Sequence, residues 1–230
     1  ASILRNSAVV TCGALVLLKV MPLLQLSPVA IDVLLIVGTI SAIGGALVAI
    51  AQVDIKRAFS YGTTSYLGLV FVAIAVQQPI VAVLLLFAHG LAKALIFMSV
   101  GSVIATTNCQ DITELGGLGP RMPATTGSYL IAGAGLTGVL PLGCFWCFGL
   151  LVDGLWPNYP WLVPVVLLTN ALTAFNLVRV FRQVFLDKPH PKTKRTPEVN
   201  WLMALPMVSL AVVVLLVPLI FHRIYPIAGV

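Results

Sequence analysis

Long apolar stretches make up most of the chain, and short segments rich in proline, glycine and polar residues separate them. A membrane-spanning helix needs about 20 mostly apolar residues. The stretches are long and do not alternate between apolar and polar positions, which favours helices over barrel strands. The pattern predicts an all-α, polytopic membrane helix bundle that forms a single transmembrane domain over 1–230. About seven runs are long enough: 3–26, 29–51, 58–76, 80–105, 124–150, 161–186 and 201–224.

Basic residues gather in the connections on one side of this predicted bundle. Because successive spans alternate in direction, the connections after the second, fourth and sixth runs share a side. An excess of lysine and arginine marks cytoplasmic loops, so we expect this side to face the cytoplasm or an equivalent compartment. The formal net charge of +6 follows from these loops and does not indicate nucleic acid as a partner. The residues concerned are Lys56, Arg57, Arg121, Lys188, Lys192, Lys194 and Arg195.

The composition excludes a water-soluble domain. The chain is 60% hydrophobic and 9% charged, whereas soluble domains carry roughly 25% charged residues. Three of its four cysteines lie in apolar runs, so no disulfide framework is predicted. Cys144 and Cys147 form a C-x-x-C pair without further metal-ligand residues nearby, and no metal site is predicted. The chain opens at "ASILRN", without methionine, which indicates a piece of a longer protein.

A lysine and a histidine lie near the centre of run 80–105. Placing a lysine at mid-bilayer costs about 2.5–3.5 kcal/mol on insertion scales, so Lys93 is expected to face protein or a water-filled cavity. His89 lies one helical turn away on the same face. Such a pair can hold or pass a proton, and we favour proton transfer as its role. The alternative is a structural hydrogen bond or ion pair between helices.

Other polar residues inside the apolar runs are candidates for water contacts. Ser65 belongs to a hydroxyl-rich part of the third run. A polar stripe leads toward the basic side in the sixth run, with its members at spacings of three or four: Thr169, Thr173, Asn176, Arg179 and Gln183. Such groups can line a hydrated route, or they can simply hydrogen-bond between helices. The sequence leaves both interpretations open.

Three charged residues lie in the first two runs. Lys19 and Asp32 both belong near the side opposite the basic loops. They can form an ion pair, or Lys19 can extend its ammonium to the interface. Arg5 lies near the start of the first run and is expected to anchor it at the interface.

The fifth run is predicted to be a broken helix. Pro141 removes a backbone donor and obstructs the carbonyl four residues earlier, and Gly138 and Gly143 flank it. A break at membrane depth is tolerated where the backbone is buried in protein or lines a cavity. In transporters, broken helices often mark the ion site. An ordinary proline kink is the alternative.

Several stretches resemble the antiporter-like subunits of respiratory complex I. "AQVDIKRAFSYGTTSYLG" resembles their D-I-K-R-x-x-A-Y-S-T-x-S-x-x-G segment, and "AHGLAKALIFMSVGSVI" resembles H-A-F-F-K-A-L-L-F-L-x-x-G-S-V-I. "QDITELGGLGPRMP" resembles the Q-D-I-x-x-x-G-G-L loop, and the order holds over 52–146. The lysine in "HGLAK" and the "CFW" stretch favour the largest, distal subunit type, called NdhF or NuoL. The chain would then cover much of its C-terminal half.

The resemblance fails at several positions where the family carries protonatable groups. Phe148 stands where the broken helix has a lysine after its phenylalanine–tryptophan pair. Arg5 or Asn6 stands near the usual histidine of the first run, and Leu85 occupies a second histidine position. The central chain of protonatable groups is therefore incomplete, so that protons cross by another route or the variant pumps weakly. With these departures the chain resembles the specialised cyanobacterial forms of the subunit that occur in CO2-uptake versions of the complex.

The resemblance implies a proton-translocating membrane subunit of a complex I-like NAD(P)H or ferredoxin:plastoquinone oxidoreductase in a photosynthetic thylakoid membrane. This chain would bind no cofactor itself, and quinone and NAD(P)H or ferredoxin would act on other subunits. The implied partners are other membrane subunits, above all a neighbouring antiporter-like one, together with lipids and, in the CO2-uptake form, a CO2-hydrating subunit. His89 and Lys93 would form the central relay. Water contacts or further support would come from Ser65, Thr169, Thr173, Asn176, Arg5, Lys19 and Asp32.

Two alternatives remain open. A multisubunit cation/proton antiporter shares these motifs, and sodium-dependent exchange would identify it. A non-pumping scaffold that docks a CO2-hydrating partner would explain the missing lysine and histidines, but it leaves Lys93 unexplained. A dry environment around Lys93 with a fixed ion-pair partner would support the scaffold.

Overall fold

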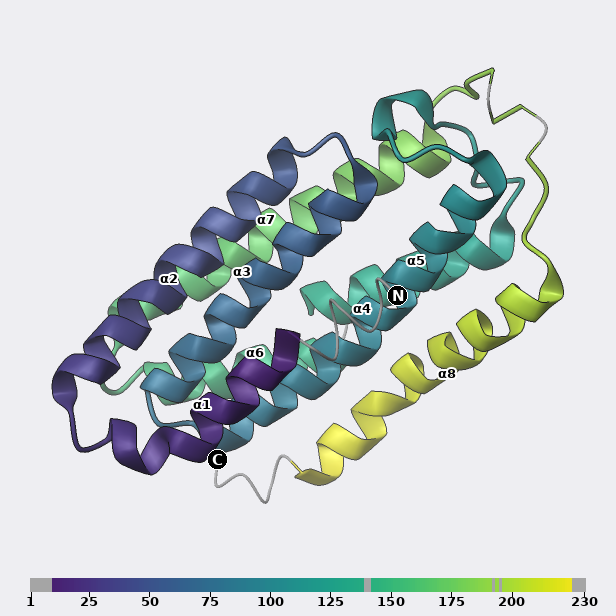
Figure 1. Cartoon of the computed structure of the whole chain (residues 1–230). Helices are drawn as coiled ribbons and strands as arrows, with labels where there is room; N and C mark the ends of the chain where they lie inside the picture. The colour runs from purple at the N-terminus through teal and green to yellow at the C-terminus, as the bar shows by residue number, and fades with distance from the viewer. Residues whose placement is uncertain (1–9, 139–141, 192, 195, 225–230) are drawn as a thin grey trace.

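The computed structural model describes residues 10–138, 142–191, 193–194 and 196–224, and these residues form a helical bundle (Figure 1). The axes of most helices are roughly aligned, with α2 at one edge of the bundle and α8 at the other. The described residues contain no strand beyond one isolated bridge between Asp54 and Asp111, so the all-α prediction is confirmed. The helices are α1 (Val10–Leu24), α2 (Pro28–Ala51), α3 (Ile55–Ala75), α4 (Pro79–Thr107), α5 (Pro123–Thr137), α6 (Gly143–Leu155), α7 (Val163–Phe181) and α8 (Trp201–Ile224).

The predicted runs correspond to these helices. Among the described residues, five segments are long and apolar enough to cross a membrane: Pro28–Ala51, Ile55–Ala75, Pro79–Thr107, Pro160–Leu186 and Trp201–Leu219. The fourth of these joins a 3-10 turn, α7 and a π-helical turn (η4, Arg182–Leu186). The fifth predicted run is split into α5 and α6, and the first is helical over Val10–Leu24.

Most helix boundaries follow from single residues. Proline occupies the first turn of α2, α4 and α5, where its missing N–H is not needed, at Pro28, Pro79 and Pro123. Asp54 caps α3, because its side chain accepts a hydrogen bond from the backbone N–H of Arg57 at 2.9 Å. Asn108 ends α4 in the left-handed conformation, with φ of 52°.

Small residues allow α2 and α3 to pack closely. A Cβ added to Gly68 would lie 2.5 Å from the backbone nitrogen of Ala42, and one added to Gly45 would lie 2.7 Å from that of Ser65. The Ser65 hydroxyl donates a hydrogen bond to the carbonyl oxygen of Ala42 at 2.6 Å. Small side chains and interhelical hydrogen bonds are the usual means of packing helices in membranes.

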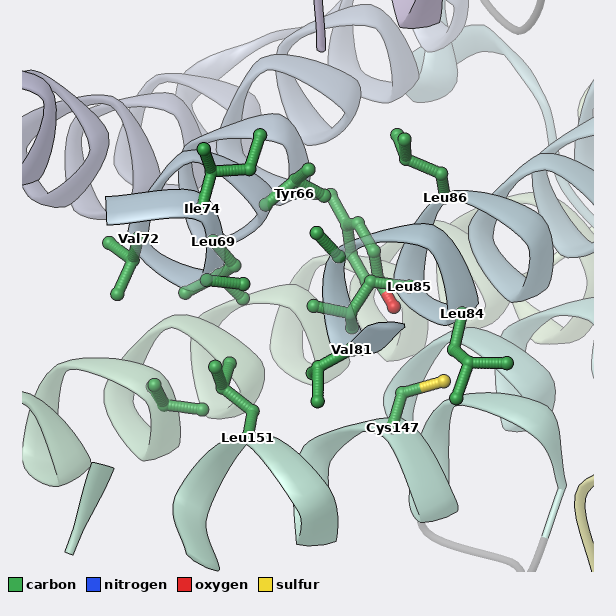
Figure 2. Close-up of a cluster of buried hydrophobic side chains, with 14 of the residues drawn as sticks. Tyr66, Leu69, Val72, Ile74, Val81, Leu84, Leu85, Leu86, Cys147 and Leu151 are labelled. Atoms are coloured by element: carbon green, nitrogen blue, oxygen red, sulfur yellow. The ribbon is translucent and has the colours of Figure 1, made fainter. Parts of the chain in front are cut away.

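A cluster of buried apolar side chains joins α3, α4 and α6 in the half of the bundle away from the basic loops. Figure 2 shows Leu69 of α3, Val81 and Leu85 of α4, and Cys147 and Leu151 of α6 converging between these helices. A second cluster, nearer the basic side, contains several buried aromatic rings. Between them the two clusters bury most of α4, so groups at its centre lie in the interior of the protein.

The connections on the basic side pack against one another. The segment between α4 and α5 packs against η4, the turn that continues α7. The backbone N–H of Gly119 donates a hydrogen bond to the Phe185 carbonyl there at 2.9 Å. Glu198, just before α8, accepts hydrogen bonds from the backbone N–H of Ala124 at 2.9 Å and from the hydroxyl of Thr125 at 2.7 Å. Its carboxylate therefore caps the N-terminus of α5, where negative charge is favourable.

Candidate functional site

Lys93 lies in the interior at the middle of α4 and is 3% exposed. Its ammonium donates a hydrogen bond to the carbonyl oxygen of Phe59 on α3 at 2.8 Å. The nitrogen lies 5.5 Å from the centre of the Phe59 ring. Within the described part of the chain this is the ammonium's one hydrogen bond, and no carboxylate pairs with it.

A glycine on α3 leaves the space that the ammonium occupies. A Cβ added to Gly62 would lie 3.1 Å from the Lys93 nitrogen. The carbonyl of Phe59 also accepts a hydrogen bond from the Thr63 hydroxyl at 3.2 Å. The first two turns of α3 therefore give Lys93 a neutral acceptor and the room to reach it.

A small cavity lies beside Lys93. It offers about 10 Å³ to the centre of a water molecule, which is about the space that one water needs. Thr173 and Asn176 of α7 give it polar groups, so the structure brings these two residues together with Lys93. The full lining is Ala46, Ala49, Phe59, Gly62, Lys93, Leu136, Thr173, Asn176 and Leu177.

The polar stripe of α7 extends beyond this cavity in both directions. Away from the basic side, the Thr173 hydroxyl donates to the carbonyl of Thr169 at 2.9 Å. The Thr169 hydroxyl is buried and has no hydrogen-bond partner among the described residues. Toward the basic side, Arg179 donates to the Asn176 side-chain oxygen at 3.4 Å and to the Gln52 carbonyl at 2.8 Å. Arg179 belongs to the polar stripe predicted from the sequence, but it is not among the residues predicted to contact water.

His89 lies one turn from Lys93 and is 1% exposed. Its imidazole stacks on the ring of Tyr66, with centroids 4.0 Å apart and planes at 24°. Neither ring nitrogen has a hydrogen-bond partner within the described chain. The Tyr66 hydroxyl donates to the sulfur of Cys144 at 3.1 Å. The histidine is therefore not hydrogen-bonded to Lys93, and the sequence gives no signal for its contact with Tyr66.

The break between α5 and α6 lies next to this aromatic group. Gly138 ends α5 with φ of +62°, a conformation that favours glycine. A Cβ there would also lie 3.1 Å from the backbone of Phe145 and 3.2 Å from the Phe148 ring. Gly143 begins α6 and is buried, whereas Pro141 lies outside the described residues. The structure thus supports the predicted break, and the two glycines mark its edges.

Two side chains complete the surroundings of the break. Asn170 of α7 donates a hydrogen bond to the Thr137 carbonyl at 2.8 Å, which satisfies a backbone group that the end of α5 leaves free. Phe148, which stands where the resemblance places a lysine, lies with its ring centre 6.0 Å from that of Tyr66. An aromatic ring therefore takes the place of a cation between the break and His89.

The remaining predicted residues do not line the cavity. Ser65 uses its hydroxyl in the contact between α2 and α3. Lys19 on α1 and Asp32 on α2 are both exposed. Arg5 lies outside the described residues. No group of three or more histidine, cysteine or acidic residues close enough to hold a metal ion occurs in the part of the chain that the structure describes.

The profile of one protein family, described as "NADH:quinone oxidoreductase/Mrp antiporter, TM", matches residues 1–173. The chain belongs to this family. Its described residues form apolar helices that pack around buried polar groups. The resemblance stated from its motifs is confirmed.

Several members of this family are similar to the chain over most of its length. The "NAD(P)H-quinone oxidoreductase subunit 5, organellar chromatophore 2" of Paulinella chromatophora is 67% identical over 230 residues, which is 100% of this chain and 37% of the relative. "NADH-ubiquinone oxidoreductase chain 5" of Sus scrofa is 35% identical over 191 residues, covering 82% of this chain and 32% of that protein. The chain thus spans about a third of the length of these relatives.

Two solved structures share the fold of this family member. A chain of the Mrp complex from Dietzia sp. DQ12-45-1b superposes with a TM-score of 0.78 at 16% identity, covering 86% of this chain and 46% of that one. A chain of an archaeal membrane-bound sulfane sulfur reductase gives a TM-score of 0.79 at 21% identity, covering 85% and 34%. At these identities the similarity shows the fold alone.

Proposed function

We propose that this chain is part of a proton-translocating membrane subunit of a complex I-like oxidoreductase that passes electrons from NAD(P)H or ferredoxin to a quinone, plastoquinone in a thylakoid membrane. The observation that carries the proposal is the environment of Lys93. Its ammonium is buried at the centre of α4, bonds to a neutral carbonyl and adjoins a cavity with room for about one water.

A neutral acceptor suits a group that gains and loses a proton. Both an ammonium and a neutral amine have N–H donors, so the bond from Lys93 to the Phe59 carbonyl can persist in either state. A buried carboxylate partner would instead tie the lysine to its charged form, because removing one charge of a buried pair leaves the other uncompensated. The absence of such a partner among the described residues supports proton handling and weighs against the scaffold alternative.

His89 is the second proton carrier in this proposal. It lies one helical turn from Lys93 and has two nitrogens without partners in the described chain. Thr173 and Asn176 would hold the water beside Lys93, and Thr169 would hold one between the cavity and the break. Buried polar groups without protein partners are commonly bridged by water. Ser65 has a packing role in this scheme.

Electron transfer would take place on other subunits, where quinone and NAD(P)H or ferredoxin bind. Energy would reach this chain as a conformational or electrostatic change from a neighbouring antiporter-like subunit. The departure at Phe148 favours the CO2-uptake form of the complex, in which a CO2-hydrating subunit would be a further partner. The family also contains Mrp antiporters, so a cation/proton antiporter is the second candidate.

The decisive variant is Lys93→Gln in the full-length subunit of the assembled complex. In membrane vesicles we expect quinone reduction to continue while proton uptake falls by at least about tenfold, as for the loss of a positioned proton carrier. The control is Lys188→Gln, which changes an exposed lysine on the basic side. Proton uptake at the level of the unaltered complex in assembled Lys93→Gln would refute the proposal. Sodium-dependent proton exchange without quinone reductase subunits would favour the antiporter.

A further inference from the structure

Arg179 lies between the cavity beside Lys93 and the loops of the basic side. Asn176 lines the cavity, and its side-chain oxygen accepts a hydrogen bond from the guanidinium at 3.4 Å. The same guanidinium nitrogen donates to the carbonyl of Gln52 at 2.8 Å. A single side chain therefore links the wall of the cavity to the connection between α2 and α3.

That connection borders an open polar hollow on the basic side. The hollow has a volume of about 690 Å³ and is wide enough for many waters. Gln52 belongs to its lining, so the residue that accepts the Arg179 hydrogen bond also faces bulk water. The other lining residues are Ala51, Val53, Asp54, Arg57, Gln110 and Asp111. Water in this hollow is separated from the cavity by the layer that contains Arg179.

The guanidinium is held by few contacts. Both of its acceptors are uncharged, and its Nε is buried without a partner in the described chain. Hydrogen bonds to neutral acceptors are weaker than the two-pronged pairing with a carboxylate that arginine commonly forms. Two carboxylates, Asp54 and Asp111, lie in the hollow and would attract a guanidinium that left its place.

We propose that Arg179 is the gate through which water and protons from the basic side reach the cavity beside Lys93. In the position seen here the side chain closes the route, and rotation toward the hollow opens it. Arg179 is thus a positioning residue that controls access without itself carrying the proton. This inference rests on the proposed function, since a gate implies that something passes.

A purely structural role makes a different prediction. Gln52 follows the last turn of α2, where free carbonyls favour a positive charge. Arg179 would then serve only to cap α2, and its removal would lower stability without changing access to the cavity. Measuring access directly separates the two roles, and it does not depend on whether the complex pumps.

The experiment uses Thr173→Cys as a reporter, because Thr173 lines the cavity and makes no hydrogen bond to Arg179. It is carried out in the assembled complex with Cys12 and Cys109 replaced by serine, in vesicles whose basic loops face outward. Silver ion, which is small enough for a site of about one water and binds thiols, is added. The thiols that remain free are then alkylated after unfolding, and modification of the new cysteine is followed by peptide mass spectrometry. Arg179→Ala should speed this modification by about tenfold or more, since losing a hydrogen bond to a charged group shifts an equilibrium by that factor.

Arg182→Ala is the matched control, because Arg182 lies on the next turn of the same helix segment and is exposed. It should leave the modification rate unchanged. Equal rates with and without Arg179 would overturn the gate and leave the capping role. If Arg179→Ala does not assemble, Arg179→Lys decides in the same way, because lysine keeps the charge but has fewer donors. If Lys93→Gln stops pumping while the modification rates with and without Arg179 are equal, the gate is refuted and the proposed function stands.

Discussion

The ring of Tyr66 covers the imidazole of His89, with centroids 4.0 Å apart and planes at 24°. The hydroxyl of the same tyrosine is bonded to Cys144, in the first turn of α6. One side chain on α3 therefore contacts both the histidine of α4 and the start of the second half of the broken helix. Any movement of α6 relative to α3 would disturb the surroundings of His89.

The bond between Tyr66 and Cys144 can be tested by a pair of substitutions. Tyr66→Phe keeps the ring on His89 but removes the donor, and Cys144→Ala removes the acceptor. Each should destabilise the subunit by about 1 kcal/mol, the net worth of a typical hydrogen bond. Because both substitutions remove the same bond, the double variant should be about as stable as the less stable of the two single variants. Thermal unfolding in detergent measures this, and strictly additive losses would contradict a shared bond.

Gly62→Ala should disturb Lys93 without changing any charge. The added methyl group would lie 3.1 Å from the ammonium, which would have to shift from the Phe59 carbonyl. We expect proton uptake in vesicles to fall several-fold at unchanged quinone reduction, and stability to fall by about 1 kcal/mol. Gly90→Ala is the control, since a methyl group there meets nothing within 4 Å. Normal uptake in Gly62→Ala would show that the position of the ammonium is not critical.

Gly68→Ala should separate α2 from α3. A methyl group at this position would lie 2.5 Å from the backbone nitrogen of Ala42, and a backbone cannot move aside as a side chain can. Overpacking of this kind typically costs about 1–3 kcal/mol, so we expect a lower thermal unfolding temperature. Gly44→Ala, in the same pair of helices, has open space and should change little. Similar unfolding temperatures for both variants would argue against the close contact of α2 and α3.

Phe148→Lys would place a cation where the resemblance to antiporter-like subunits expects one. Phe148 is half-buried and lies 6.0 Å from the Tyr66 ring, so an ammonium there would face the group around His89. If the missing lysine limits the route, we expect more protons to be taken up per electron transferred. Phe148→Met is a neutral control of similar size. If the assembled Phe148→Lys complex takes up as many protons per electron as the unaltered complex, protons do not pass this position.

The sequence predicts the helices well because their boundaries depend on local features. Proline in the first turns, Asp54 as a cap and the glycines around the break all act within a few residues of their own position. The burial of Lys93 is equally predictable, since an ammonium at mid-bilayer depth must face protein or water. Its nearness to Thr173 and Asn176 follows from the spacing of the stripe on α7 together with the way that the helices assemble.

The contacts between distant helices could not be predicted. Arg179 reaches a carbonyl 127 residues earlier in the chain, and Tyr66 reaches a sulfur 78 residues later. Such pairs depend on how each helix is rotated about its axis, which the apolar pattern leaves open when a helix is apolar on all sides. Ser65 illustrates this limit, because a hydroxyl in a buried helix can face water or another helix, and here it bonds to α2.

Helix α5 is hydrogen-bonded to the C-terminal part of the chain along its whole length. Hydrogen bonds join it to the C-terminal part of the chain at its start through Glu198, at its middle through Tyr129 and Leu177, and at its end through Asn170. The first turn of α6 is instead tied to α3 through Tyr66. A sliding displacement of α7 and α8 would therefore drag α5 along as a rigid rod, while α6 stayed with α3. The strain would fall on the break between Gly138 and Gly143, and the half that begins at Gly143 is bonded to Tyr66, the residue that stacks on the histidine.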